Sequence, residues 1–219
     1  MSEREGEAIF IDPALEANFK RGIFNAIIAP RPIGWISTVN PDGTANLAPF
    51  SYFNIVSTQP AILMFSCNTP EDRPKKDTVA NVRATGEFVF NLVSHALVEP
   101  MNRTSSPVGP HVDEFDLVGL AKAPSRMVAP PRVAASPVSL ECRVLRIINF
   151  GGGDDGPETD VTFGQVVGIH IAAGYLDPQG YFDTAKAQPV ARLGGAEYAV
   201  SQPSFVLERQ FTRAGEATY

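Results

Sequence analysis

The stretch PRPIGWISTVNPDGTANLAPFSYFNIVSTQPAILMFSCN, Pro30 to Asn68, carries the clearest strand pattern of the 219-residue chain. Residues 33–39 and 61–67 are two runs of mainly apolar side chains, many of them β-branched or aromatic, which favour strands. The turn sequence Asn-Pro-Asp-Gly at 40–43 follows the first run, and Pro60 precedes the second. We therefore expect two strands within this stretch.

Between the two runs lies a block of small, amide-bearing and proline residues. Beside a flat polar ring, such residues let the backbone approach closely and leave N–H and C=O groups free to hydrogen-bond its edge. The alternative is an ordinary strand edge at which Pro49 stops further pairing. The block consists of Asn46, Leu47, Ala48, Pro49, Phe50 and Ser51.

A second polar group surrounds residues 75–85, whose pattern predicts a short helix that Asp77 or Thr78 caps and Gly86 ends. Free N–H groups and the dipole make a helix start a ready anion site. The alternative is an ordinary surface helix with two solvated lysines. Together with the end of the second strand, the group comprises Ser66, Asn68, Lys76, Asp77, Thr78 and Asn81.

The rest of the chain is also rich in short strands. We expect a strand at 87–93, a helix at 94–103, a Ser/Pro-rich loop at 104–112, and an antiparallel hairpin from 138 to 171 with its tip at 151–156. In its second strand, residues 161, 163, 167, 169 and 171 are expected on one face. Many strands and few helices indicate a β-barrel or a β-sandwich, which the pattern alone does not separate.

The segment RPIGW at 31–35, the 46–51 block and KKDTVAN at 75–81 together resemble the flavin reductase-like family of FMN-binding split barrels, and within it the flavoredoxin branch. The resemblance implies a mainly β fold, an antiparallel split β-barrel with a few short flanking helices. It implies an N-terminal arm at 1–22 and a single domain at 23–219.

The resemblance also assigns roles to the site residues. The strand end and the Lys-Asp-Thr segment would hold the phosphate tail of FMN, with Lys76 as a point charge and Thr78 as a donor. The 46–51 block would meet the pyrimidine edge and ribityl chain. Trp35, the single tryptophan, would lie against the isoalloxazine ring or pack in the core, and Arg31 would serve the phosphate or a surface ion pair.

Among the histidines and cysteines, one histidine is a candidate for catalysis and the others are expected to be structural or exposed. His111, in the 104–112 loop, is a candidate to orient a nicotinamide or to donate to the reduced ring, with a solvated loop histidine as the alternative. His95 and His170 are expected to be structural or exposed. Cys67 and Cys142 lie in apolar runs without paired spacing, and we expect them in the core.

The function implied is an FMN-binding flavoprotein oxidoreductase, an enzyme in which NADH or NADPH transfers hydride to FMN. The alternative is a flavoredoxin-like electron carrier that passes electrons to a protein partner without substantial NAD(P)H activity. A third possibility is a barrel that binds another ligand. The family commonly forms homodimers with flavin near the interface, and we expect the same here.

Composition excludes several other classes. A net charge of −6 and no basic run longer than Lys75-Lys76 argue against nucleic-acid binding. No stretch is long enough to span a membrane and no signal peptide is evident, so we expect a cytoplasmic protein. The chain lacks a Cys/His metal cluster, a dinucleotide-binding glycine motif after a strand, a phosphate loop and a nucleophile elbow.

Overall fold

The computed structural model describes residues 8–13, 21–69, 75–109, 111–151, 158–201 and 204–207. The main sheet contains β2 (Gly34–Val39), β3 (Ala45–Phe50), β4 (Phe53–Thr58), β5 (Ala61–Asn68), β6 (Glu87–Asn91), β9 (Val138–Phe150) and β10 (Thr159–Ile171). Smaller sheets are formed by β1 (Arg31–Pro32), β11 (Val190–Arg192) and β12 (Tyr198–Val200), and by β7 (Lys122–Ala123) and β8 (Arg132–Val133). The helices are α1 (Arg21–Ile27), α2 (Asp77–Thr85), η1 (His95–Leu97), α3 (Val98–Arg103), α4 (Glu114–Val118), η2 (Ala173–Tyr175) and α5 (Thr184–Ala187).

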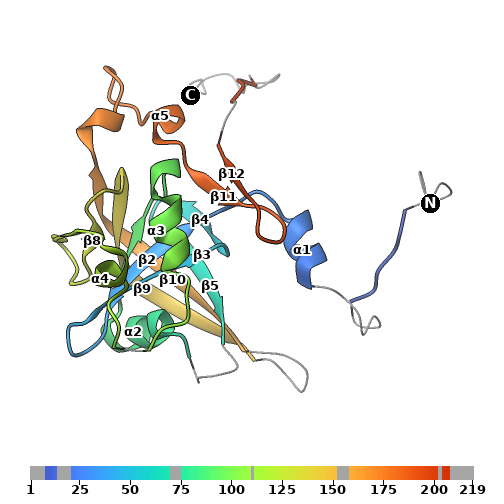
Figure 1. The fold of residues 1–219 in the computed structure, drawn as a ribbon, viewed down its shortest axis with the longest axis horizontal. Coiled ribbons are helices and arrows are strands. Elements are labelled where there is room, and N and C mark those ends of the chain that lie inside the picture. The colour runs from blue at the N-terminus through green and yellow to red at the C-terminus, as the bar shows by residue number, and fades with distance from the viewer. Residues whose placement is uncertain are drawn as a thin grey trace.

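The main sheet is antiparallel, and its seven strands run in the order β3-β2-β6-β9-β10-β5-β4 (Figure 1). The strands at the two ends of this order, β3 and β4, follow one another directly in the chain. The sheet therefore curls until its ends meet at the β3–β4 turn. This arrangement confirms the expected antiparallel β fold with few, short helices.

The interior of the curled sheet is filled by aromatic and aliphatic side chains. Phe65 and Phe88 meet edge to face with ring centroids 5.3 Å apart, and Val79 and Val82 of α2 join the same cluster. Gly34 is required here, because a Cβ on it would lie 2.5 Å from Cδ2 of Phe53. The glycine of the RPIGW segment thus makes room for a core phenylalanine.

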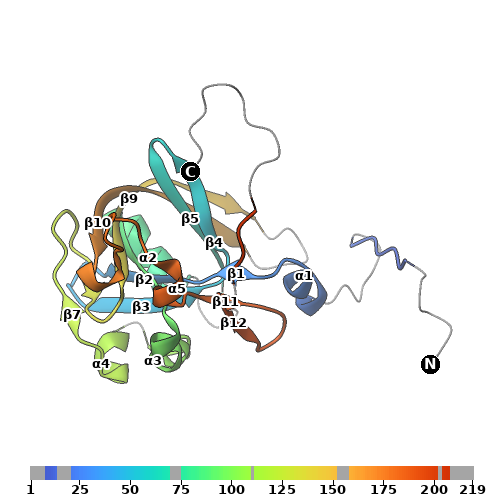
Figure 2. The same ribbon diagram turned by 90° about the horizontal axis from the view of Figure 1, so that it is seen from above.

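A second cluster lies on the outer face of β2 and β3. It contains Trp35, Leu47, Met101, Phe115 and Val133, which come from the two strands, from α3 and α4, and from β8. Figure 2 shows α3 and α4 on the side of β2 and β3 that is opposite β4 and β5. The main sheet is thus covered on its outer face as well as filled inside.

The predicted helix at 75–85 is confirmed, but its cap is not the one expected. The helix starts at Asp77, its N-cap is Lys76 and the cap makes no side-chain hydrogen bond. The hydroxyl of Thr78 instead accepts a hydrogen bond from Asn46. Gly86 ends the helix in the left-handed region, at φ 72°, as predicted.

The β9–β10 hairpin is also confirmed, although residues 152–157 of its tip lie outside the described residues. The predicted single face on its second strand is wrong. The register shift between Val166 and Gly168 makes Val167 a bulge, so positions 161 and 163 lie on the opposite face from 169 and 171. In β9 the polar residues Ser139 and Glu141, which alternate with apolar ones, are fully buried.

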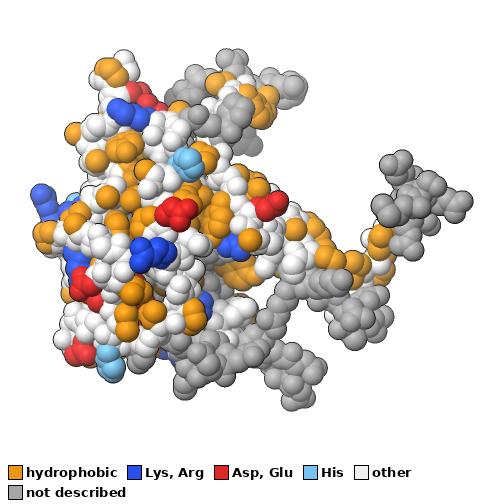
Figure 3. Space-filling view, viewed as in Figure 1, with side chains coloured by type: hydrophobic (Ala, Val, Ile, Leu, Met, Phe, Trp, Pro, Cys, Tyr) orange, Lys and Arg blue, Asp and Glu red, His pale blue; other side chains and the backbone are white. Residues whose placement is uncertain are grey.

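The cysteines and the helices agree with the sequence analysis. Cys67 and Cys142 are free and buried, and burial raises the pKa of the Cys67 thiol to about 11, which disfavours a reactive thiolate. Among the described residues, no helix has the length and apolar character needed to cross a membrane. On the face drawn in Figure 3, lysine and arginine side chains are scattered.

Candidate functional site

A cavity of about 250 Å³ lies along the outer edge of β3. The start of α2 and the segment at 104–108, after α3, form its other walls, and Glu114, the first residue of α4, completes it. It brings together residues that are up to 68 positions apart in the chain, from Asn46 to Glu114. The predicted site residues that line it are Asn46, Ala48, Pro49, Lys76, Asp77 and Thr78.

The start of α2 offers the chemistry of an anion site. Lys76, the N-cap residue, is in extended backbone conformation, and its own side chain makes no capping hydrogen bond to the first N–H groups of the helix. Its ammonium group is exposed and lies 5.6 Å from the centre of the Phe50 ring. Lys75 differs, because its Nζ forms ion pairs of 2.8 Å with Glu158 and Asp160. Lys76 is therefore the lysine available to a ligand.

A buried network of amides and hydroxyls holds α2 against the sheet. Asn46 Nδ2 donates to Thr78 Oγ1 at 2.9 Å and to Thr38 Oγ1 at 3.3 Å. Asn81 Nδ2 donates to the same Thr38 oxygen at 3.0 Å. Asn46 and Thr78 therefore line the cavity in fixed positions, while Asn81 supports them from behind and does not line it.

Glu114 closes the edge of β3 on the side of α4. Its carboxylate accepts a hydrogen bond of 2.9 Å from the backbone N–H of Leu47, and its side chain is almost fully buried. Burial raises the pKa of Glu114, and the negative charges of Asp77 and Asp113 raise it further. The hydrogen bond from Leu47 lowers the pKa, but the net shift is upward. The Leu47 N–H, expected to be free for a ligand, is therefore already bonded.

Trp35 lies behind the cavity and does not line it. Its ring is fully buried in the outer cluster, and Nε1 donates to Thr104 Oγ1 at 2.9 Å. The Thr104 hydroxyl in turn donates to the carbonyl of Met101 at 2.7 Å. Of the two roles considered for this tryptophan, the structure places it in core packing, where it fixes the start of the 104–108 segment.

Arg31 is also placed away from the cavity. The buried guanidinium donates to the backbone carbonyls of Asn25, Ile28 and Leu193, the last at 3.0 Å. It therefore joins the end of α1 to the turn after β11.

The remaining predicted residues lie outside the cavity. Asn68 Oδ1 accepts a hydrogen bond from Thr159, and Ser66 pairs with β10. Phe50 packs in the interior cluster. The side chain of His111 is 79% exposed, with Nδ1 3.7 Å from Asp42 Oδ2. The predicted residues that do not line the cavity are Arg31, Trp35, Leu47, Phe50, Ser51, Ser66, Asn68, Asn81 and His111.

Two parts of the site were not singled out from the sequence. The Ser/Pro-rich composition identified the 104–112 loop, but only His111 within it was chosen, whereas Thr104 to Val108 line the cavity. Nothing in the sequence separates Glu114 from its neighbour Asp113. That neighbour caps α4, since its carboxylate accepts a hydrogen bond from the Phe115 N–H.

The arrangement fits a phosphorylated ligand with a flat polar group. A lysine and the start of a helix lie at one end, and hydroxyl-bearing residues line the cavity together with a strand edge. Within the described part of the chain, no group of His, Cys, Asp and Glu side chains is placed to hold a metal ion.

Comparison with known proteins agrees with this chemistry. Residues 28–189 match the family model described as flavin reductase like domain. An uncharacterised protein of Aquifex aeolicus is 39% identical over 172 residues, which cover 78% of this chain and 85% of that protein.

Solved structures extend the comparison to the fold. Nitrilotriacetate monooxygenase component B from Bacillus cereus is 30% identical, with a TM-score of 0.86, and the match covers 92% of this chain and 99% of that chain. A putative flavin reductase with a split barrel domain from Shewanella frigidimarina is 20% identical, with a TM-score of 0.76 and coverage of 90% and 94%. The expected split-barrel fold is confirmed.

Proposed function

The chain belongs to the flavin reductase-like family, and from this membership we propose that it is an FMN-dependent oxidoreductase that takes hydride from NADH or NADPH. The observation that carries the proposal is that one cavity joins the start of α2, with Lys76, to the edge of β3. The phosphate of FMN would lie at the start of α2, and its ring would lie along the edge of β3.

Each wall of the cavity has a role in this proposal. Lys76 and the first N–H groups of α2 bind the phosphate, with the Thr78 hydroxyl as a further donor. Asn46, Ala48 and Pro49 lie along the ring, where the absence of large side chains on Ala48 and Pro49 permits close approach. In the 104–108 segment, Ser105 and Ser106 face the ribityl chain, whereas the Thr104 hydroxyl is engaged by Trp35 and Met101.

FMN supplies the hydride chemistry, so the chain's own residues bind, orient and tune it. Glu114 is a positioning residue, since its carboxylate fixes the β3 backbone through Leu47. His111 stays a candidate for the reductant side, because it follows the segment that lines the cavity.

The proposal includes a homodimer in which the second copy completes the flavin site. The cavity of about 250 Å³ is smaller than the roughly 300–1,000 Å³ of pockets that enclose such ligands. Large apolar side chains are also exposed on α1 and β4, among them Phe24, Ile27, Ile55 and Val56. Both features are explained if a second copy covers them.

Light scattering tests the dimer directly. The purified protein is expected at about twice the chain mass of 23.6 kDa. A monomer that retains stoichiometric, tightly bound FMN would contradict the shared site.

Two measurements test the function. FMN titration should give saturable binding with one flavin per chain, and rapid mixing of this complex with NADH or NADPH should bleach the oxidised-flavin absorbance. Binding without bleaching would favour the alternative, an electron carrier that receives its electrons from a protein partner. No flavin binding would reject both.

A further inference from the structure

A second cavity, of about 570 Å³, lies between the C-terminal half of β10 and the loop that leads into β9. Its volume falls within the roughly 300–1,000 Å³ typical of small-molecule sites. Glu141, Val89, Ser37 and Leu47 are successive cross-strand partners from β9 to β3. At ~4.8 Å per strand, three spacings place Glu141 roughly 14 Å from the flavin edge, so the two cavities are separate.

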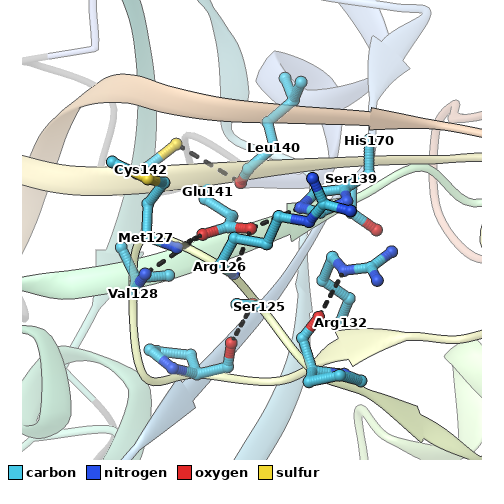
Figure 4. Close-up of polar contacts among 12 residues, drawn as sticks. Ser125, Arg126, Met127, Val128, Arg132, Ser139, Leu140, Glu141, Cys142 and His170 are labelled. Atoms are coloured by element: carbon cyan, nitrogen blue, oxygen red, sulfur yellow. Dashed lines mark hydrogen bonds and ion pairs between the residues drawn. The ribbon is translucent and has the colours of Figure 1, made fainter.

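The buried carboxylate of Glu141 forms the back wall of this cavity, and its oxygens accept several hydrogen bonds. Glu141 accepts hydrogen bonds from the backbone N–H groups of Arg126, Met127 and Val128, at 2.8, 2.5 and 3.1 Å (Figure 4). It also contacts Nε2 of His170. Both of its oxygens are therefore engaged by hydrogen bonds, and it fixes the loop that carries Arg126.

Two arginines line the same cavity, which contains one carboxylate, that of Glu141. Figure 4 shows the Arg126 and Arg132 side chains extending from the loop toward the same region, and Arg132 Nε donates to the carbonyl of Pro124 at 3.1 Å. Among the described residues, neither guanidinium forms an ion pair, and Glu141 is the only carboxylate in the lining. Two like charges that face one cavity repel each other unless an anion lies between them.

The backbone of β10 keeps the cavity open. The bulge at Val167 places Gly168 opposite Glu141, and a Cβ on Gly168 would lie 3.3 Å from Cδ of Glu141. At the rim, the side chains of Met127 and Ile169 are 48% and 63% exposed. The cavity thus combines a cationic wall with an apolar rim.

We propose that this cavity binds a small organic anion, whose carboxylate or phosphate lies between Arg126 and Arg132 and whose apolar part packs against Met127 and Ile169. The guanidinium fork matches both anionic groups. The site is distinct from the proposed flavin site and does not depend on it.

The test titrates the full-length protein with benzoate, with phenyl phosphate and with benzamide as a neutral analogue, followed by saturation-transfer NMR. At least one anionic probe should bind, and benzamide should bind at least tenfold more weakly. Arg126→Ala, at an exposed position, and the double variant Arg126→Ala/Arg132→Ala should each weaken anion binding, the double variant by tenfold or more. Arg146→Ala removes an exposed arginine of β9 outside the cavity and should leave the affinity within twofold.

Each titration is repeated with saturating FMN, which should not change the affinity. The proposal is overturned if no anionic probe binds, if benzamide binds equally well, or if FMN displaces the anion. It is also overturned if both arginine variants keep full affinity while their thermal unfolding midpoints match that of the parent protein.

Discussion

Replacing Lys76 by alanine is expected to weaken FMN binding while leaving riboflavin binding nearly unchanged. The ammonium group lines the cavity at the start of α2 and is exposed before a ligand binds. A hydrogen bond to a charged group is worth roughly 1.5–3 kcal/mol, and solvent screening favours the lower end. The expected loss of FMN affinity is therefore about tenfold.

Lys75 provides a matched control one position away. Its ammonium group is engaged by Glu158 and Asp160, so Lys75→Ala makes the same change in net charge without removing a group that faces the cavity. Fluorescence titrations with FMN and with riboflavin, on both variants and the parent protein, separate a phosphate contact from a general effect.

Either of two results would contradict a contact between Lys76 and the phosphate of FMN. Equal losses for FMN and riboflavin in Lys76→Ala would mean that the lysine acts on folding and not on the phosphate. An equal FMN loss in Lys75→Ala would mean that the overall charge of the region matters, and not the position of one ammonium group.

Three further predictions concern ionisable residues. Because the pKa of Glu114 is raised in the folded protein, its contribution to stability falls as pH rises from the ordinary glutamate range through the raised value. Glu114→Gln should lose this pH dependence, which urea unfolding at several pH values measures. In Asp160, burial raises the pKa, but hydrogen bonds, from Lys75 first, outweigh it and hold the pKa low. Its stabilisation is present above the ordinary aspartate range and is lost as pH falls through the lowered pKa. Because Lys75 and Arg83 are partly exposed and can rehydrate, Asp160→Asn should cost roughly 1.5 kcal/mol in denaturant unfolding at neutral pH. His111→Ala should leave FMN affinity within about twofold, because the imidazole is outside the cavity, and should slow flavin reduction in rapid-mixing kinetics; unchanged kinetics would make it a solvated loop residue.

Much of the fold follows from local sequence signals. The strands near 33–39 and 61–67 and the helix that ends at Gly86 were predicted because side-chain type and turn residues act over a few positions. The burial of Glu141 was not, because a loop from 15 residues upstream covers it and supplies its hydrogen-bond donors. Alternation along a strand carries no information about such a cover.

The candidate site was likewise predicted only where the signal in the sequence is local. Lys76 and Thr78 follow from the properties of a helix start, which are local. Trp35 was ambiguous, since an aromatic residue near a cofactor and one behind it have the same sequence pattern, and only its hydrogen bond to Thr104 distinguishes them. Glu114 was missed because its role depends on the Leu47 N–H, 67 residues away.

The hydrogen bond between Leu47 and Glu114 has a consequence for the solubility of the molecule. β3 is an edge strand, and exposed edge N–H groups are templates on which foreign strands assemble. Along an antiparallel strand every second N–H points outward, so the outward position that follows Leu47 belongs to Pro49, which has no N–H to offer. The N–H of Leu47 is already bonded to Glu114, and position 49 has no N–H to offer a foreign strand. Strand-by-strand aggregation of a single chain is therefore expected to begin at the other edge, where β4 exposes Ile55 and Val56, and the proposed second copy would protect that edge by covering them.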